Sequence, residues 1–309
     1  MAAGIVNPFA GQHLRPIWHA DTALVDLEAT LDLAGASRHY SKSGVLRPAS
    51  SAAQAELFRT AASSNTWLTS EDVKEQYPWL NADFGALHTP GGQVDTSQFL
   101  LDTQQKLQER GGTVRRNAHV TGWTESTRQG SITLQSGVRH SASLIVLAVG
   151  YGYLRFPALN RLNLHSVKGQ TVEVSHLPGL KLALPVCGQG YVAPGTKSLT
   201  LGTTYERDFD DLTPTRSGQR AIIKLTSSMI PRLANAGVTG AAAGVRVGVP
   251  GTRLPMVGPI GRRVWIFTGL GSKGLLFAPH IARRLPAWLE NPEHVPPEIR
   301  VRLRQTTGP

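Results

Sequence analysis

A glycine-rich turn near the carboxyl end constrains the fold of this 309-residue chain more than any other feature. From Val264 to Leu289 the sequence reads VWIFTGLGSKGLLFAPHIARRLPAWL, so Gly269-x-Gly271-x-x-Gly274 separates an apolar, strand-like run from an amphipathic, helix-like run. Glycine accepts positive φ and has no side chain, so such a turn lets the backbone approach a ligand closely. On spacing alone, the pattern is also compatible with an ordinary tight turn.

A nicotinamide-binding fingerprint does not fit this position. That fingerprint opens a βαβ unit of about 30 residues, and an acidic ribose ligand follows about 20 residues later. After Gly274 the sequence contains a helix-like run and the proline-containing segment 292–309, with no further strand-like run. We therefore expect a different role for the turn.

Hydrophobic periodicity elsewhere indicates alternating helices and strands. The run 144–149 is wholly apolar and ends before Gly150, as expected of a buried strand in an open α/β nucleotide-binding sheet. Segments rich in turns and alternating residues indicate a separate antiparallel sheet. We predict helices over 13–34, between 95–97 and 111–112, over 217–233 and over 275–289, and strands within 113–126, 131–137, 144–149, 165–177, 189–195, 198–206, 244–249, 254–258 and 264–269.

Composition narrows the cellular setting. The single cysteine, Cys187, excludes an internal disulfide and a cysteine-based metal cluster, which favours a cytoplasmic protein. The apolar runs are too short to span a bilayer and the first residues lack the features of a signal peptide, so no membrane partner is expected. A net charge of +11 suits polyanionic partners, although scattered basic residues also suit a merely solvated surface.

Several segments together are more specific than the glycine pattern. GVRVGVPGTRLPMVG, GLGSKGL followed by AP, KGQTVEVSHLP, and VCGQGYVAP followed by LGTTYERDFDD resemble the D-amino-acid-oxidase-like (DAO) FAD-dependent oxidoreductases. The resemblance covers most of residues 2–291. Within the family it is strongest to the C-terminal oxidase domain of the bifunctional enzyme that modifies the wobble uridine of tRNA. It implies FAD as the cofactor.

The resemblance also implies cofactor-binding residues. A helix start offers N–H groups and the positive end of a dipole, which favour negative charge developing on a reduced flavin. Val120 corresponds to the position whose backbone meets the adenine, and Ala148 and Gly150 to the strand end beside the nucleotide. At the flavin we expect Gly269, Gly271, Ser272, Lys273, Gly274 and Leu275.

On the substrate side, Arg246 in AGVRVGV aligns with the family arginine that holds a substrate carboxylate, and its planar fork suits two charge-assisted hydrogen bonds. Arg253 is a second candidate, and Tyr191 in QGYVAP is a candidate pocket wall. Each also has an ordinary structural interpretation, as a salt-bridged arginine or a strand aromatic. No catalytic acid or base and no metal ligand is assigned, because the flavin carries the chemistry.

The implied fold is mixed α/β and α+β, with a Rossmann-like FAD/NAD(P)-binding domain interleaved with an antiparallel-sheet substrate domain. The order of segments crosses between the two domains more than once. We assign 1–35, 89–165 and 251–291 to the FAD-binding domain, 36–88 and 166–250 to the substrate domain, and 292–309 to a flexible tail.

The beginning of the sequence departs from the family pattern. Family members start with a strand, a Gly-x-Gly-x-x-Gly turn, a helix and a second strand ending in an acidic ribose ligand; this sequence starts inside the following segment, at MAAGIVNPFAG. We therefore expect the first βαβ unit to be missing. Either the start is assigned too late, at a misread valine codon, or the chain is a remnant with little flavin affinity. A Gly-x-Gly-x-x-Gly in the genomic frame upstream of Met1 favours the first explanation, and an in-frame stop contradicts it.

Three functions remain open. The resemblance favours oxidation of an amine C–N bond, with hydride transfer to flavin and hydrolysis of the imine, on carboxymethylaminomethyl-uridine in tRNA. The alternatives are oxidation of a small free amino acid (glycine, sarcosine or a D-amino acid) and a non-catalytic remnant. Strong salt dependence of substrate binding would favour tRNA. The oligomeric state and the electron acceptor are not predicted.

Overall fold

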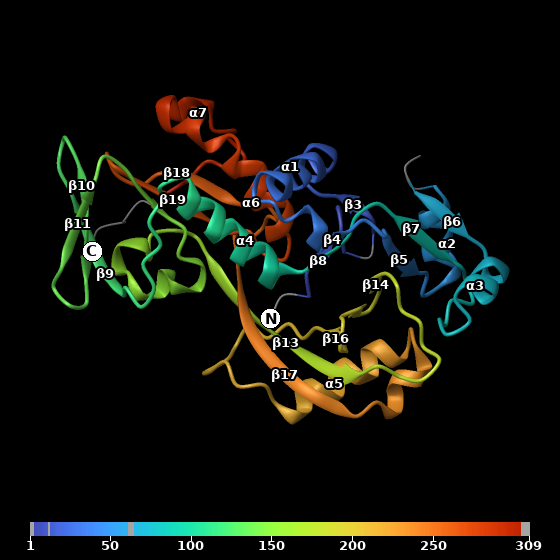
Figure 1. The fold of residues 1–309 in the computed structure, drawn as a ribbon. Coiled ribbons are helices and arrows are strands. Elements are labelled where there is room, and N and C mark those ends of the chain that lie inside the picture. Colours follow the sequence, from blue (N-terminus) through green and yellow to red (C-terminus); the bar gives the residue numbers. More distant parts are fainter. Residues whose placement is uncertain (1–2, 12, 61–64, 304–309) are drawn as a thin grey trace. The chain divides into compact units, whose positions relative to one another are not determined.

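The computed structural model describes residues 3–11, 13–60 and 65–303 (Figure 1). Two compact units are formed, each from two stretches of the chain. The first comprises Met1–Lys106 and Lys168–Gly244, and the second comprises Leu107–Val167 and Val245–Pro309. The assignment of five segments to cofactor and substrate domains concerns function and stays a prediction.

An eight-stranded mixed sheet is the main element of the first unit. Across the sheet the strands are β17 (Val238–Gly248), β13 (His165–Ser175), β16 (Ser198–Gly202), β15 (Tyr191–Ala193), β14 (Val186–Cys187), β5 (Val45–Pro48), β7 (Ala86–Thr89) and β6 (Thr66–Leu68). Neighbouring strands pair antiparallel from β13 through β16 and β15 to β14, parallel between β14 and β5, and antiparallel from β5 through β7 to β6.

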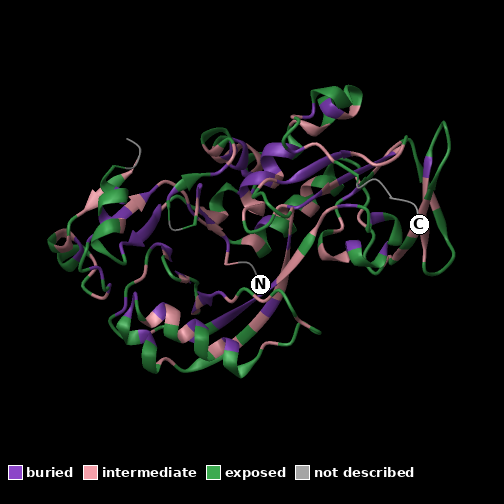
Figure 2. Cartoon of the chain, turned by 180° about the vertical axis from the view of Figure 1, so that it is seen from behind, coloured by how far each residue is buried: buried purple, intermediate pink, exposed green. Residues whose placement is uncertain are grey.

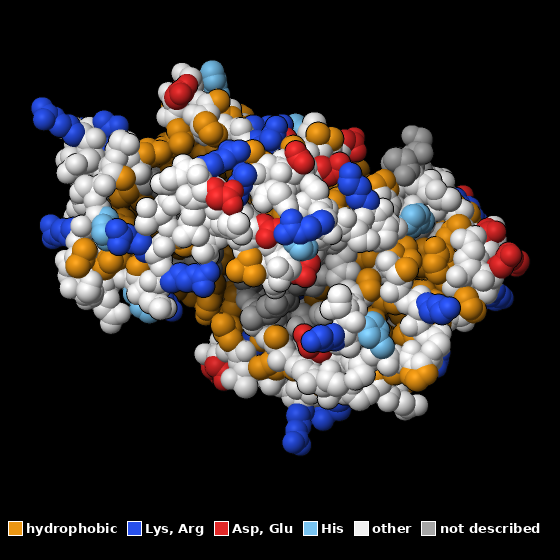
Figure 3. Space-filling view, viewed as in Figure 1, with side chains coloured by type: hydrophobic (Ala, Val, Ile, Leu, Met, Phe, Trp, Pro, Cys, Tyr) orange, Lys and Arg blue, Asp and Glu red, His pale blue; other side chains and the backbone are white. Residues whose placement is uncertain are grey.

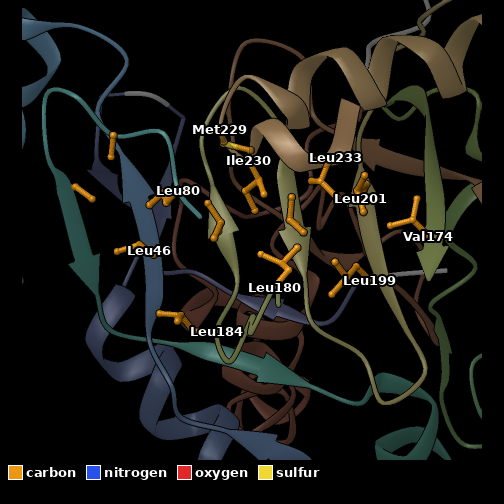
Figure 4. Close-up of a cluster of buried hydrophobic side chains, with 14 of the residues drawn as sticks. Leu46, Leu80, Val174, Leu180, Leu184, Leu199, Leu201, Met229, Ile230 and Leu233 are labelled. Atoms are coloured by element: carbon orange, nitrogen blue, oxygen red, sulfur yellow. The ribbon is translucent and has the colours of Figure 1, made fainter. Parts of the chain in front are cut away.

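Helix α5 (Arg216–Ser227) contributes to the hydrophobic core of this sheet. Its Ile222 and the following Ile230 and Leu233 are fully buried with strand residues such as Leu199 and Leu201 (Figure 4). Complete burial of such an aliphatic side chain contributes about 1.5–3 kcal/mol relative to exposure. Apolar alternation along β16 therefore explains why this face of the sheet is covered.

A partly buried polar network connects the start of α5 to the sheet. Gln170 accepts a hydrogen bond at Oε1 from the backbone N–H of Thr215 (2.7 Å) and donates from Nε2 to Glu206 (2.7 Å). Thr215 caps α5 by accepting from the N–H of Gly218, whose position leaves no room for a Cβ beside Gln170. The ammonium of buried Lys168 lies 3.7 Å from Glu206. The KGQ segment thus has a structural role.

Because of this network, we expect the free energy of unfolding to fall at acidic pH. Burial of Glu206 raises its pKa, but hydrogen bonds from Thr204 and Gln170 and the charge of Lys168 outweigh burial, so the pKa lies below its usual value. In the unfolded chain the Glu206 carboxylate binds a proton at about pH 4.3. The contribution of Glu206 to the free energy of unfolding is therefore complete above that pH, and it is lost as pH falls through the lower pKa of the folded state.

We expect Glu206→Gln to flatten the acid limb of a plot of unfolding free energy against pH, measured by urea denaturation. Glu290→Gln, at the exposed end of a helix in the second unit, removes the same charge outside the network and serves as the control. Equal acid slopes in wild type and Glu206→Gln would contradict the prediction.

Two of the remaining helices of the first unit, α2 (Ala52–Arg59) and α3 (Ser70–Gln76), begin at polar caps. Helix α3 starts with a capping box in which Thr69 and Asp72 exchange hydrogen bonds, and Ser51 caps α2 by accepting from Gln54. The helices are α1 (Ala20–Leu33), α2 (Ala52–Arg59), α3 (Ser70–Gln76) and α4 (Thr96–Glu109), with 3-10 turns η1 (Ser37–His39) and η4 (Pro231–Asn235); the small sheets are β1 (Ile5–Val6) with β8 (Gly92–Val94) and β4 (Tyr40–Ser41), and β2 (Phe9–Ala10) with β3 (Arg15–Pro16).

The second unit contains two three-stranded sheets. In one, β19 (Val264–Thr268) lies between parallel β12 (Ile145–Leu147) and antiparallel β18 (Met256–Pro259). In the other, β10 (Gly130–Leu134) lies between β9 (Val120–Glu125) and β11 (Arg139–Ala142), both antiparallel. The helical elements are η2 (Gly150–Arg155), η3 (Pro157–Leu159), α6 (Gly274–Ala282), α7 (Leu285–Glu290) and η5 (Pro292–His294).

The predicted buried strand 144–149 is shorter and more exposed than its composition indicates. Only Ile145–Leu147 form β12, which lies at the edge of its sheet among the described strands, and Val146 is 37% exposed. The buried strand of this sheet is β19, with Val264, Trp265, Ile266 and Thr268 buried (Figure 2). Composition alone does not distinguish a central strand from an edge strand.

Three predicted helices end or begin at backbone interruptions. The helix predicted over 13–34 begins only at Ala20, because Leu14 and His19 have positive φ. The helix predicted over 217–233 covers Arg216–Ser227 and gives way to a 3-10 turn that starts at Pro231. The helix predicted over 275–289 is divided into α6 and α7, with a proline in the first turn of α7.

The segment 292–309, predicted to be a flexible tail, is packed over its described part. Val295 and Ile299 are buried, the N–H of Val257 donates to Ile299, and the N–H of Val301 donates to Val257. These apolar residues explain the docking, because leaving them in water costs free energy. Residues 304–309 lie outside the described part. Within the described part, no helix has the length and hydropathy of a membrane span.

Candidate functional site

The glycine turn joins β19 to α6 in the second unit, as its sequence indicates. Gly269 has φ +74° and Gly271 has φ +55°, both in the left-handed region that favours glycine. A Cβ on Gly269 would lie 3.0 Å from Val249 and 3.3 Å from the backbone nitrogen of Met256, whereas a Cβ on Gly271 would meet nothing within 4 Å. The turn is therefore packed at its first glycine and open at its second.

A backbone hydrogen bond connects this turn to the end of β17. The N–H of Gly271 donates to the carbonyl oxygen of Val247 at 2.9 Å. Arg246, half-buried, directly precedes Val247 on β17, and side chains alternate along a strand, so Arg246 and buried Val247 point to opposite faces. The structure thus brings Arg246 beside the glycine turn, 25 positions away in the sequence (271 − 246).

The start of α6 supplies polar groups suited to a ligand. The backbone N–H groups of Gly274 and Leu275 have no acceptor among the described residues, and Lys273 precedes the helix without a side-chain cap. The buried hydroxyl of Thr268, at the end of β19, likewise has no hydrogen-bond partner in the described part. Buried polar groups are normally satisfied, so these donors suit a bound polar ring such as a flavin.

The other predicted nucleotide contacts lie at a strand end or on the adjoining hydrophobic cluster. Leu147 of β12 is in parallel register with Ile266 of β19, so Ala148 and Gly150 follow at the sheet edge where the glycine turn begins. Ligands of open α/β sheets bind at this carboxyl edge. Val120 opens β9 and packs against the cluster that contains Leu147.

The positions of Arg253 and Tyr191 give less support for a role in substrate binding. Arg253 is exposed in the turn between β17 and β18. Tyr191 belongs to the first unit, where it is half-buried on β15 and its ring occupies the space that a side chain on Gly202 would need. Ser272 is exposed in the glycine turn. All of these site assignments remain predictions.

Sequence reasoning missed Thr268 and Val247. Thr268 could have been suspected as a hydroxyl residue in an otherwise apolar strand, directly before the turn. Val247 acts through its backbone carbonyl, which no sequence pattern reveals. Among the described residues, no cluster of three or more His, Cys, Asp or Glu could hold a metal ion.

Comparison with known families decides the affiliation. Residues 2–288 match the family described as FAD dependent oxidoreductase (DAO). The chain belongs to this family. Its mixed α/β fold is the DAO fold, and its cofactor is FAD.

Among curated DAO proteins, the tRNA 5-methylaminomethyl-2-thiouridine biosynthesis bifunctional protein MnmC of Burkholderia mallei is 38% identical over 125 residues, a match covering 39% of this chain and 19% of that protein. The corresponding MnmC of Burkholderia pseudomallei matches equally. The matched stretch is therefore about a fifth of these relatives' length.

Solved structures show the same DAO fold. Iminodiacetate oxidase from Chelativorans sp. BNC1 superposes with a TM-score of 0.80 at 24% identity, covering 97% of this chain and 88% of that one. Glycine oxidase from Geobacillus kaustophilus superposes with a TM-score of 0.74 at 20% identity, covering 88% and 78%.

Proposed function

We propose that this DAO family member oxidises the C–N bond of a carboxylated amine, and that its substrate is carboxymethylaminomethyl-uridine in tRNA. The observation that carries the proposal is the hydrogen bond from Gly271 to Val247, because it ties the turn expected at the flavin to the strand that presents Arg246. The partial match to MnmC proteins supports tRNA as the substrate class.

In this proposal, different residues bind the cofactor and the substrate. When bound, FAD supplies the hydride acceptor. The N–H groups at the start of α6 and the Thr268 hydroxyl would hold the polar edge of the ring, because they have no partner among the described residues. Arg246 holds the substrate carboxylate through two charge-assisted hydrogen bonds, which orients the neighbouring C–N bond. No protein nucleophile is needed.

A basic groove along α5 supports RNA as the partner. Arg216, Arg220 and Lys224 recur every four residues and so share one face, about 6 Å apart along the helix. With apolar Ile223 and Val238 they line a cavity of about 520 Å³ that has no acidic side chain among its lining residues. Within the described part, no ion pair engages these three cations.

Such an arrangement is unfavourable without a partner. Like charges one turn apart repel each other, and phosphate groups relieve this repulsion while releasing counterions. Basic side chains are also spread over the face shown in Figure 3. The regularly spaced basic residues of α5 are therefore stronger support for RNA binding than the net charge alone.

Replacing Arg216, Arg220 and Lys224 together with glutamine tests this assignment. We expect weaker tRNA binding and a plot of log K against log salt whose slope falls in magnitude by about 2 to 3, as for three lost phosphate contacts. The measurement is fluorescence anisotropy with labelled tRNA. The matched control replaces exposed Arg115, Arg128 and Arg139 with glutamine, which changes net charge equally.

An unchanged salt slope in the α5 variant would refute RNA binding at this groove. Salt-independent turnover of glycine or sarcosine by the FAD-loaded protein would favour a free amino acid as the substrate instead. Failure to retain FAD would favour the non-catalytic alternative.

A further inference from the structure

A second cavity in the first unit has no role in the proposed chemistry. It has a volume of about 220 Å³ and is lined by none of the residues assigned to flavin or substrate. Leu46 of β5 and Val186 of β14 are in parallel register, so Arg47 and Cys187 follow side by side and both line the cavity. Ser50, Gln54 and the loop 81–84 contribute further lining.

Arg47 is a buried charge without an anionic partner. It is 6% exposed, and its Nη2 donates to the carbonyl oxygen of Gly11 at 2.6 Å. Its guanidinium carbon lies 5.8 Å from the centre of the Phe58 ring. The Nε atom is buried without an acceptor, and none of the described carboxylates lies within ion-pair distance.

This environment is costly for a cation. Burial lowers the pKa of Arg47 from its usual value, and the nearby Cys187 opposes that change. An arginine keeps its proton regardless, so the uncompensated charge persists. A water molecule could accept from Nε but would not neutralise the charge, and the cavity is larger than the about 30 Å³ that one water occupies in the liquid.

The surroundings indicate which ligand would compensate. A guanidinium donates to the paired oxygens of a carboxylate or a phosphate. The Ser50 hydroxyl and the Gln54 amide, joined by a 2.9 Å hydrogen bond, add polar groups to the wall. Asp83 is exposed where it lines the cavity and disfavours a highly charged ligand.

We propose that this cavity, the Arg47 site, binds a small oxyanion, either a carboxylate or a phosphate, through the inward-facing guanidinium of Arg47. This inference does not depend on the proposed function, because its residues belong neither to the glycine turn nor to the α5 groove.

Cys187 makes the site measurable, because it is the single cysteine of the chain and lines the cavity. The experiment follows the rate at which an uncharged aromatic disulfide modifies the full-length protein, in the presence of inorganic phosphate, acetate or chloride at equal ionic strength. An anion in the cavity shields the thiol, so the rate should fall saturably, about tenfold at ten times the dissociation constant.

The outcomes are distinct. Protection by phosphate alone, by acetate alone or by both supports the site and identifies its chemistry. Protection by none of them, or equal protection by chloride, overturns it. Arg47→Met should abolish protection, whereas Arg59→Met, which removes an exposed arginine at the end of α2, should leave it unchanged. Should Arg47→Met fail to fold, the wild-type anion comparison still decides.

Discussion

Replacing Arg246 with methionine is expected to lower kcat/KM for the carboxylated amine by about 100-fold, equivalent to about 3 kcal/mol. The substrate carboxylate would then lose its charged partner in a half-buried setting. Arg246→Lys should recover only part of this loss, because an ammonium cannot make the planar, paired contact. The measurement is steady-state kinetics of the FAD-loaded protein with tRNA carrying carboxymethylaminomethyl-uridine.

Substrate variation separates a carboxylate-binding role from a structural one. With the corresponding carboxamide, wild type and Arg246→Met should differ little, because the neutral group makes no ion pair. Arg253→Met is the matched control, since Arg253 is exposed in the neighbouring turn. Equal losses on acid and amide would show that Arg246 supports the fold and does not select the substrate.

Gly269→Val is expected to produce protein without bound flavin and with a markedly lower unfolding temperature. At φ +74° a β-branched residue is strained, and its Cβ would lie 3.0 Å from Val249 and 3.3 Å from the backbone nitrogen of Met256. Overpacking of this kind costs about 1–3 kcal/mol beyond the backbone strain. The displaced turn would also release the hydrogen bond from Gly271 to Val247.

Gly251→Val isolates the steric effect. Gly251 has the same φ of +74° and lies in the same compact unit, and a Cβ at this position would meet no heavy atom within 4 Å. The variant should therefore show backbone strain of about 1–2 kcal/mol and keep its flavin. Absorbance of the purified proteins and thermal unfolding report the two effects. Flavin retained equally by both variants would remove the turn from the cofactor site.

Local features were predictable because short-range chemistry determines them. The glycine turn between β19 and α6 was recognisable from Gly269, Gly271 and Gly274, since positive φ and close approach favour glycine. The DAO family followed from the combination of segments. Helix α4 also lies where its capping residues and terminal glycines indicate.

Boundaries and exposure were less predictable because they depend on neighbours. The apolar run 144–149 suggested a buried strand, yet Val146 lies on an edge strand of the described sheet. The segment 292–309 is expected to be flexible, but its Val295 and Ile299 are buried. Hydropathy indicates whether burial of a side chain is favourable, but it does not indicate whether the fold places another surface over that side chain.

By itself, the sequence determined the family, the cofactor class and the location of the glycine turn, because each can be recognised from short stretches of consecutive residues. Only the tertiary structure placed Arg246 beside that turn, assigned the KGQ segment to a polar network and buried Arg47 without a carboxylate. These depend on contacts between distant segments, whose geometry is set by packing and by backbone hydrogen bonds that leave no pattern in the sequence.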